Sequence, residues 1–182
     1  VHASALKAIR LLGLGSERVV RVSADNQGRM RAELLPDISG PTIVLIQAGN
    51  VNSGAFDPAA EVIEKAHQAG AWVHVDGAFG LWALASKHHT HLTVGFNQAD
   101  SWAMDAHKWL NVPQDSGLAI IRSAVDQRAA MSATAAYLIA GSDREPCHYT
   151  PEMSRRARGV EIWAALRSLG RSGLSDLVNR TC

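Results

Sequence analysis

Residues 71–78 have the sequence AWVHVDGA, and residues 99–109 have the sequence ADSWAMDAHKW. Each stretch is predicted to be a mostly apolar β-strand that leads to a functional side chain. Asp76 closes the first strand, and Lys108 follows the second strand by a few residues. In an open α/β sheet, ligands bind beyond the carboxyl ends of the strands. We therefore expect a carboxylate and an amine to meet at one edge of a sheet.

The segment before the first of these strands predicts a parallel sheet. Thr42–Ile46 is a continuous apolar run, as expected of a buried parallel strand. Asp57 and Pro58 predict a helix start, with Asp57 as the N-cap, and Gly70 predicts the end of this helix after Gln68. A strand, a helix and a second strand in this order form a βαβ unit, which favours parallel pairing.

Further elements are predicted from helical spacing, apolar runs and turn residues. They are a helix over residues 3–12, a short strand over 19–22, a turn over 25–28, a strand over 116–122, and helices near 155–168 and 173–181. Residues 132–153 lack clear periodicity and predict a long loop, a feature that often marks a lid or binding loop. The predicted fold class is α/β, with three layers: a mostly parallel sheet and helices on both faces.

The composition is that of a soluble globular domain. The 182 residues are 47% apolar and 19% charged, enough for one domain with a substantial core. The net charge of +1 indicates neither a nucleic acid nor a membrane surface as partner. No apolar run approaches the roughly 18 residues of a membrane span. The two cysteines predict no disulfide framework, and a cytoplasmic location fits this.

Five segments, taken in order, resemble the group II amino acid decarboxylases that depend on pyridoxal 5'-phosphate (PLP). These are relatives of the aromatic amino acid and glutamate decarboxylases, of the aspartate aminotransferase fold (fold type I). The segments are His2–Ala8, Ala48–Asp57, His74–Ala78, Ala99–Trp109 and Ser154–Arg158. The resemblance implies a PLP cofactor, an amino acid substrate and a homodimer. It also indicates that residues 1–182 are an incomplete PLP-binding large domain, without the upstream part and the C-terminal small domain.

The resemblance implies roles for three residues at the predicted sheet edge. Lys108 forms the Schiff base with the cofactor aldehyde. Asp76 keeps the pyridine nitrogen protonated, so that the ring accepts electrons from a carbanion at Cα. Its alternative role is the N-cap of a helix that begins near Gly77. Ala78 packs against one face of the ring, where only a small side chain leaves room.

Three more residues have a cofactor role by resemblance and a structural alternative. His2 stacks on the opposite ring face, or it is a surface histidine at a helix start. His107 supports the cofactor phosphate or the substrate, or it orders the turn through backbone hydrogen bonds. Asn52 bonds the ring hydroxyl, or it holds its turn, as Asn commonly does.

The predicted function is PLP-dependent decarboxylation of an amino acid through Lys108. Other fold type I reactions, transamination or aldehyde-releasing cleavage, stay open because they share the cofactor site. So does an inactive fragment, because the family's upstream phosphate-binding loop is absent from these residues. His88–His91 is predicted to be a solvated loop, and no metal site is expected. The substrate and the role of Tyr149 are not identified by the sequence.

Overall fold

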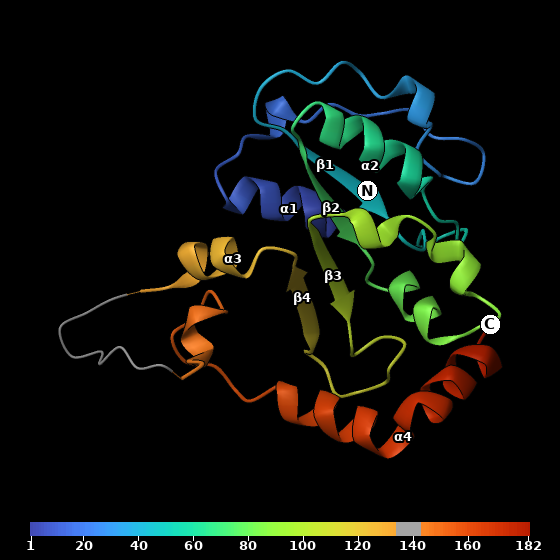
Figure 1. Cartoon of the computed structure of the whole chain (residues 1–182), viewed down its shortest axis with the longest axis vertical. Helices are drawn as coiled ribbons and strands as arrows, with labels where there is room; N and C mark the ends of the chain where they lie inside the picture. The colour runs from blue at the N-terminus through green and yellow to red at the C-terminus, as the bar shows by residue number, and fades with distance from the viewer. Residues whose placement is uncertain (134–142) are drawn as a thin grey trace.

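The computed structural model describes residues 1–133 and 143–182. Within these residues, four strands form one sheet in the order β1 (Ile43–Gln47), β2 (Trp72–Asp76), β3 (Ser101–Asp105) and β4 (Gly117–Ile121). The first three strands are parallel, and β4 runs antiparallel to β3 (Figure 1). The predicted α/β class with a mostly parallel sheet is confirmed.

The register of the strands sets the shape of the carboxyl edge. Gln47 of β1 lies opposite Asp76 of β2, so these two strands end level. Asp76 in turn lies opposite Ala103, and β3 therefore continues two residues further, to Asp105. The end of β3 and the residues that follow it project beyond the tip of β2.

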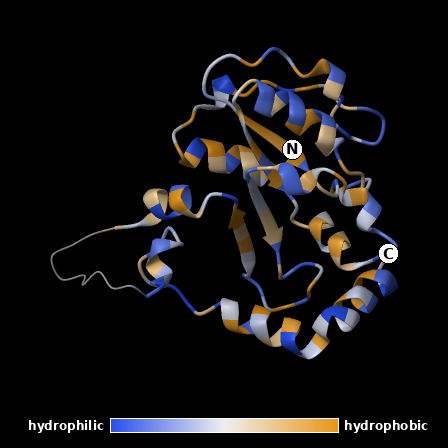
Figure 2. Ribbon diagram, viewed as in Figure 1, coloured by the Kyte–Doolittle hydropathy of each residue, from blue (hydrophilic) through white to orange (hydrophobic). Residues whose placement is uncertain are grey.

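One face of the sheet is packed against helix α2 (Ala59–Gln68). Alternate residues of β1 and β2 are buried on this face together with three residues of α2; they are Val44, Ile46, Val73, Val75, Val62, Ile63 and Ala66. Burial of each larger aliphatic side chain contributes about 1.5–3 kcal/mol. Figure 2 shows the hydrophobic colouring of β1 and β4 and the mixed colouring of the outer helices. Strands β1 and β2 therefore form the centre of the core, whereas β4 has no buried residue.

The other helices are α1 (Ala3–Leu11), α3 (Ala124–Met131) and α4 (Gly159–Arg180). Short 3-10 helices lie at η1 (Ser16–Arg18), η2 (Ala32–Leu34), η3 (Gly80–Ala85), η4 (Thr90–Thr93), η5 (Phe96–Gln98) and η6 (Pro146–His148). Helix α4 crosses the lower part of the molecule beyond the tip of β3 (Figure 1). Its residues Ile162 and Val178 pack in a second buried cluster with Trp82, Ala106 and Leu110. This cluster supports the segment around Lys108 from below.

Most predicted elements are confirmed, with differences in three places. The predicted strand over 19–22 is wrong: no strand pairing forms there in the described structure, and Val20 is 71% exposed. The two predicted C-terminal helices are the halves of α4, which is interrupted at Gly170, where φ is 60°. Helix α3, whose N-cap is Ser123, was not among the elements predicted from the sequence. Residues 134–142 of the predicted long loop lie outside the described residues.

Asp57 is not the N-cap of α2, as the sequence predicted. Pro58 occupies the cap position, and the Asp57 carboxylate turns inward instead. It accepts hydrogen bonds from the backbone N–H of Met30 at 2.6 Å and of Gln47 at 2.7 Å. Burial raises the pKa of Asp57, and these two hydrogen bonds oppose that rise. The residue therefore ties an N-terminal segment to the end of β1.

Replacement of Asp57 with alanine is expected to destabilise the fold. Two partly buried N–H groups would lose their acceptor, at a cost of about 1–3 kcal/mol each and about 2–6 kcal/mol together. The measurement is the free energy of unfolding in urea. Glu64→Ala on the exposed side of α2 is the control and is expected to change stability by less than about 1 kcal/mol. Equal stability of the two variants would contradict this role of Asp57.

Candidate active site

The turn after β2 is bonded to the end of β3. The backbone N–H of Gly77 donates to the carbonyl of Ala103 at 2.9 Å, and the N–H of Asp105 donates to the carbonyl of Ala78 at 3.3 Å. The residues that follow Asp76 therefore lie directly against the segment that leads to Lys108. This is the single sheet edge that the sequence predicted.

Lys108 places its amine between groups from both strand tips. Its Nζ lies 2.7 Å from Oδ2 of Asp105 and 4.4 Å from the centroid of the Phe79 ring. Phe79 belongs to the turn after β2, whereas Asp105 ends β3. The Lys108 side chain is 31% exposed, so its amine is held in place but remains accessible to a ligand.

Asp76 lies half-buried at the tip of β2 and bonds to its own turn. Its Oδ1 accepts a hydrogen bond from the N–H of Ala78 at 3.3 Å. No helix begins at Gly77, because η3 starts at Gly80 and its cap position, Phe79, makes no side-chain cap. The helix N-cap alternative for Asp76 is therefore wrong, and the carboxylate caps a turn instead. Asp76 also partly offsets the burial that lowers the pKa of His74 on the same strand.

His107 is engaged with the backbone of the next strand. Its Nδ1 lies 2.6 Å from the carbonyl oxygen of Ser116 and 3.0 Å from the backbone nitrogen of the same residue. Its other ring nitrogen, Nε2, lies 3.9 Å from Oδ2 of Asp105. These contacts match the turn-ordering role, and they leave Nε2 directed toward the Lys108 ion pair.

His2 and Asn52 have local contacts only. His2 is exposed at the N-cap of α1, where its Nδ1 accepts a hydrogen bond from the N–H of Ser4. The turn at Asn52 is held by Asn50, whose Oδ1 accepts from the N–H of Asn52 at 2.9 Å. In the described residues, no hydrogen bond joins either side chain to the Lys108 edge. Their cofactor roles remain predictions.

The structure adds contacts that the sequence pattern does not indicate. Asp105 and Phe79, which contact Lys108, were not singled out by the sequence. Near the start of α4, Arg158 pairs with Asp115 through two contacts of 3.0 Å. These hydrogen bonds hold the pKa of Asp115 below its ordinary value. Arg158 thereby fastens the start of α4 to the loop that follows Lys108.

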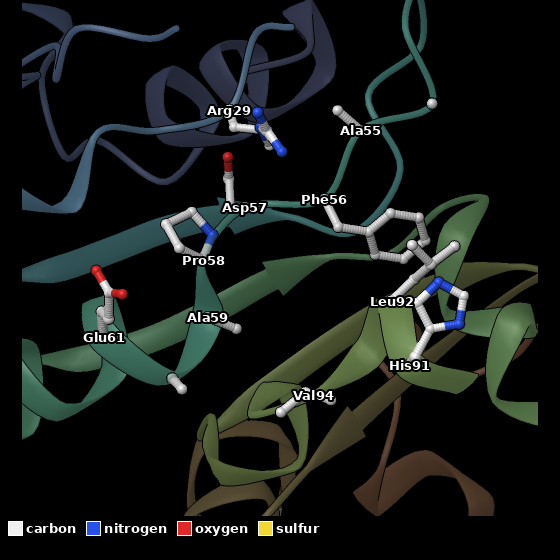
Figure 3. Close-up of a pocket in the computed structure, with 12 residues that line it drawn as sticks. Arg29, Ala55, Phe56, Asp57, Pro58, Ala59, Glu61, His91, Leu92 and Val94 are labelled. Carbon is white, nitrogen blue, oxygen red and sulfur yellow. The ribbon is translucent and has the colours of Figure 1, made fainter. Parts of the chain in front are cut away.

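Two other regions have no place in this site. A cavity of about 370 Å³ opens beside the start of α2 and is lined by Arg29, Asp57, Glu61 and His91 among others (Figure 3). None of the predicted cofactor residues lines it. The region 88–91, predicted as a loop, partly forms η4, and the described chain contains no cluster of three metal-ligating side chains.

Tyr149 lies away from any of these contacts. Its ring stacks under the guanidinium of Arg144 at 4.5 Å, and its N–H donates to the carbonyl of Pro146. Tyr149 therefore adds no group to the Lys108 edge.

Among the described helices, none is both long and apolar enough to cross a membrane.

An amine and a carboxylate at the carboxyl edge of a parallel sheet are the groups with which α/β proteins of the PLP-dependent class hold an aldehyde cofactor. The family model for the pyridoxal-dependent decarboxylase conserved domain matches residues 1–182. The chain belongs to this family, and the resemblance to group II amino acid decarboxylases is confirmed.

Individual relatives agree with this assignment. The chain is 32% identical to an acidic amino acid decarboxylase from Mus musculus, over 98% of this chain and 35% of the relative. It is also 32% identical to L-2,4-diaminobutyrate decarboxylase from Rhizobium meliloti, over 99% of this chain and 39% of the relative. The crystal structure of mouse CSAD superposes with a TM-score of 0.88 at 28% identity, over 99% of this chain and 40% of that one. The chain thus spans well under half the length of the relatives it matches.

The residues at the edge fit PLP, the cofactor of the family. The fit rests on the donor set: an accessible primary amine on Lys108, a carboxylate on Asp76, and the small side chain of Ala78 between the two strand tips. The amine suits an aldehyde, and the carboxylate suits a basic ring nitrogen.

Proposed function

We propose that the intact protein is a PLP-dependent carboxy-lyase that removes the carboxylate of an amino acid. The observation that carries this proposal is the junction of the two strand tips, which places the amine of Lys108 beside the turn of Asp76. Family membership supports the cofactor and the reaction type. The named relatives decarboxylate different amino acids, so the substrate of this protein is proposed only as an amino acid.

The residues of this chain have separate tasks in the proposed reaction. When bound, PLP supplies an aldehyde that forms an imine with Lys108 and a ring that accepts electrons. Lys108 would hold the cofactor through its amine. Asp76 would supply the negative charge that favours a protonated ring nitrogen. Ala78 leaves space for one face of the ring, and His107 keeps the turn before β4 in place.

Two further properties of the intact protein are proposed. Family resemblance supports a homodimer whose active sites lie at the dimer interface, and the two cysteines, which predict no disulfide framework, fit a cytoplasmic location. The cofactor contacts of His2, His107 and Asn52 are likewise proposed from the family resemblance. A phosphate-binding loop from outside these 182 residues would complete the cofactor site.

Product analysis tests the reaction. The intact protein with PLP is incubated with a panel of single amino acids, and carbon dioxide, amines, keto acids and aldehydes are measured. We expect carbon dioxide and the corresponding amine in equal amounts from at least one amino acid. A keto acid would favour an aminotransferase, and an aldehyde would favour an aldehyde-releasing lyase. Absence of every product, with PLP bound, would favour an inactive protein.

A further inference from the structure

Asp105 is fixed at the sheet edge by its backbone. Its N–H donates to the carbonyl of Ala78 at 3.3 Å, and its carbonyl accepts from Nε1 of Trp82 at 3.0 Å. Trp82 is itself buried in the second buried cluster, together with Ile162 and Val178 of α4. Because both main-chain groups are held, the carboxylate of Asp105 stands at a defined point beside Lys108.

Two groups that favour a positive charge contact the nitrogen of Lys108. One is Oδ2 of Asp105, at 2.7 Å, and the other is the ring of Phe79, whose centroid lies at 4.4 Å. A cation within about 6 Å of an aromatic centroid is attracted to the ring face. The two groups come from different strand tips, so the site holds a cationic nitrogen from two sides.

The other titratable groups of this edge do not take the place of Asp105. Nε2 of His107 lies 3.9 Å from Oδ2 of Asp105, beyond hydrogen-bond distance, and its Nδ1 is engaged with Ser116. Asp76 accepts from the N–H of Ala78 and forms no ion pair within the described residues. Asp105 is therefore the carboxylate that pairs directly with Lys108.

We propose that Asp105 is the counter-ion of the Lys108 nitrogen, both as the free ammonium and as the protonated imine with PLP. This rests on the proposed function of Lys108. Imine formation joins Nζ to the aldehyde carbon, releases the aldehyde oxygen as water with two of the ammonium protons, and leaves one proton on nitrogen. Asp105 takes no part in bond making, so it is a positioning residue that keeps the charge and direction of this nitrogen.

The first test is the imine absorbance of the intact protein with PLP, titrated with pH. The protonated imine absorbs at longer wavelength than the neutral imine. Loss of an opposite charge in direct contact is expected to lower the pH midpoint of this change by about 1–3 units in Asp105→Asn. Phe79→Leu is expected to lower it by less than about one unit. Asp105→Glu should restore most of the wild-type midpoint.

Asp126→Asn is the matched control, since its carboxylate lies on α3 and makes no ion pair within the described residues. Its midpoint should equal that of the wild type. An unchanged midpoint in Asp105→Asn would overturn the proposal, as would a failure of Asp105→Glu to restore it. Far-UV circular dichroism and thermal melting establish that each variant is folded.

A second test uses the cofactor-free protein and therefore does not depend on the proposed function. Trinitrobenzenesulfonate modifies neutral amines, and mass spectrometry gives the rate at Lys108 separately from the rate at exposed Lys87. At fixed pH, Asp105→Asn removes the carboxylate that contacts Nζ at 2.7 Å, and it is expected to raise the rate at Lys108 by up to about fivefold, the equivalent of about 1 kcal/mol for a partly exposed ion pair, and to leave the rate at Lys87 unchanged. An absent imine band in the wild type would overturn the proposed function and the imine part of this proposal. Equal labelling rates at Lys108 in wild type and Asp105→Asn would overturn the ion pair.

Discussion

Replacement of Lys108 with arginine is expected to abolish the imine absorbance and almost all turnover. The guanidinium stays protonated at any working pH, so it cannot form an imine with the aldehyde. It nevertheless keeps a positive charge beside Asp105 and Phe79, so the local ion pair and the cation–π contact are preserved. Loss of the reacting nitrogen should lower kcat by at least about 10²–10⁴-fold, the range of a positioned acid–base group.

The choice of arginine separates chemistry from folding. Lys108→Ala leaves Asp105 without its partner, and any loss of activity in that variant could come from disorder of the turn. Lys108→Arg should keep the wild-type melting temperature within a few degrees, because a half-exposed ion pair contributes only about 0–1 kcal/mol. Lys87→Arg, at an exposed position, is the control and should retain both absorbance and activity. Persistence of the imine band in Lys108→Arg would show that another lysine holds the cofactor.

The parallel part of the sheet was predictable because its signals are local and redundant. Thr42–Ile46 and residues 71–76 are mostly apolar runs of strand length, and the helix between them ends at Gln68, two residues before Gly70, which has a φ of 72°. The strand predicted over 19–22 failed because its apolar residues have no neighbouring strand to pair with in the described structure. β-propensity reports the fit to a half-buried sheet surface, and Val20 has no such surface.

The candidate site was only partly predictable. Lys108 and Asp76 follow strands, and the sequence could place them at one edge because parallel strands share their carboxyl end. Asp105 was not distinguishable in the same way. Like Asp76, it is the last residue of a strand, but its contact with Lys108 depends on the path of the chain through Ala106 and His107. Asp57 carried a stronger local signal for a helix cap than for its buried role, which needs Met30 from 27 residues earlier.

Replacement of Asp76 with asparagine is expected to leave the imine band in place and to lower turnover. Asparagine keeps an oxygen that can accept from the N–H of Ala78, so the turn after β2 should persist. It removes the charge that would keep the ring nitrogen protonated. An opposite charge in contact with a titrating group shifts its pKa by about 1–3 units. Loss of this charge should therefore lower the protonated fraction of the ring nitrogen, and with it kcat, by about 10–1,000-fold near neutral pH.

A cofactor analogue with a methyl group on the ring nitrogen makes this test specific. Its ring carries a permanent positive charge, so it no longer needs a carboxylate to keep a proton. We expect it to restore part of the turnover in Asp76→Ala, where the shorter side chain makes room for the methyl group, and to give no gain in the wild type. If Asp76 only caps its turn, Asp76→Asn would turn over like the wild type, and the analogue would not rescue Asp76→Ala. Loss of turnover in Asp76→Asn with rescue of Asp76→Ala would therefore separate an electrostatic role at the ring from the hydrogen bond to Ala78.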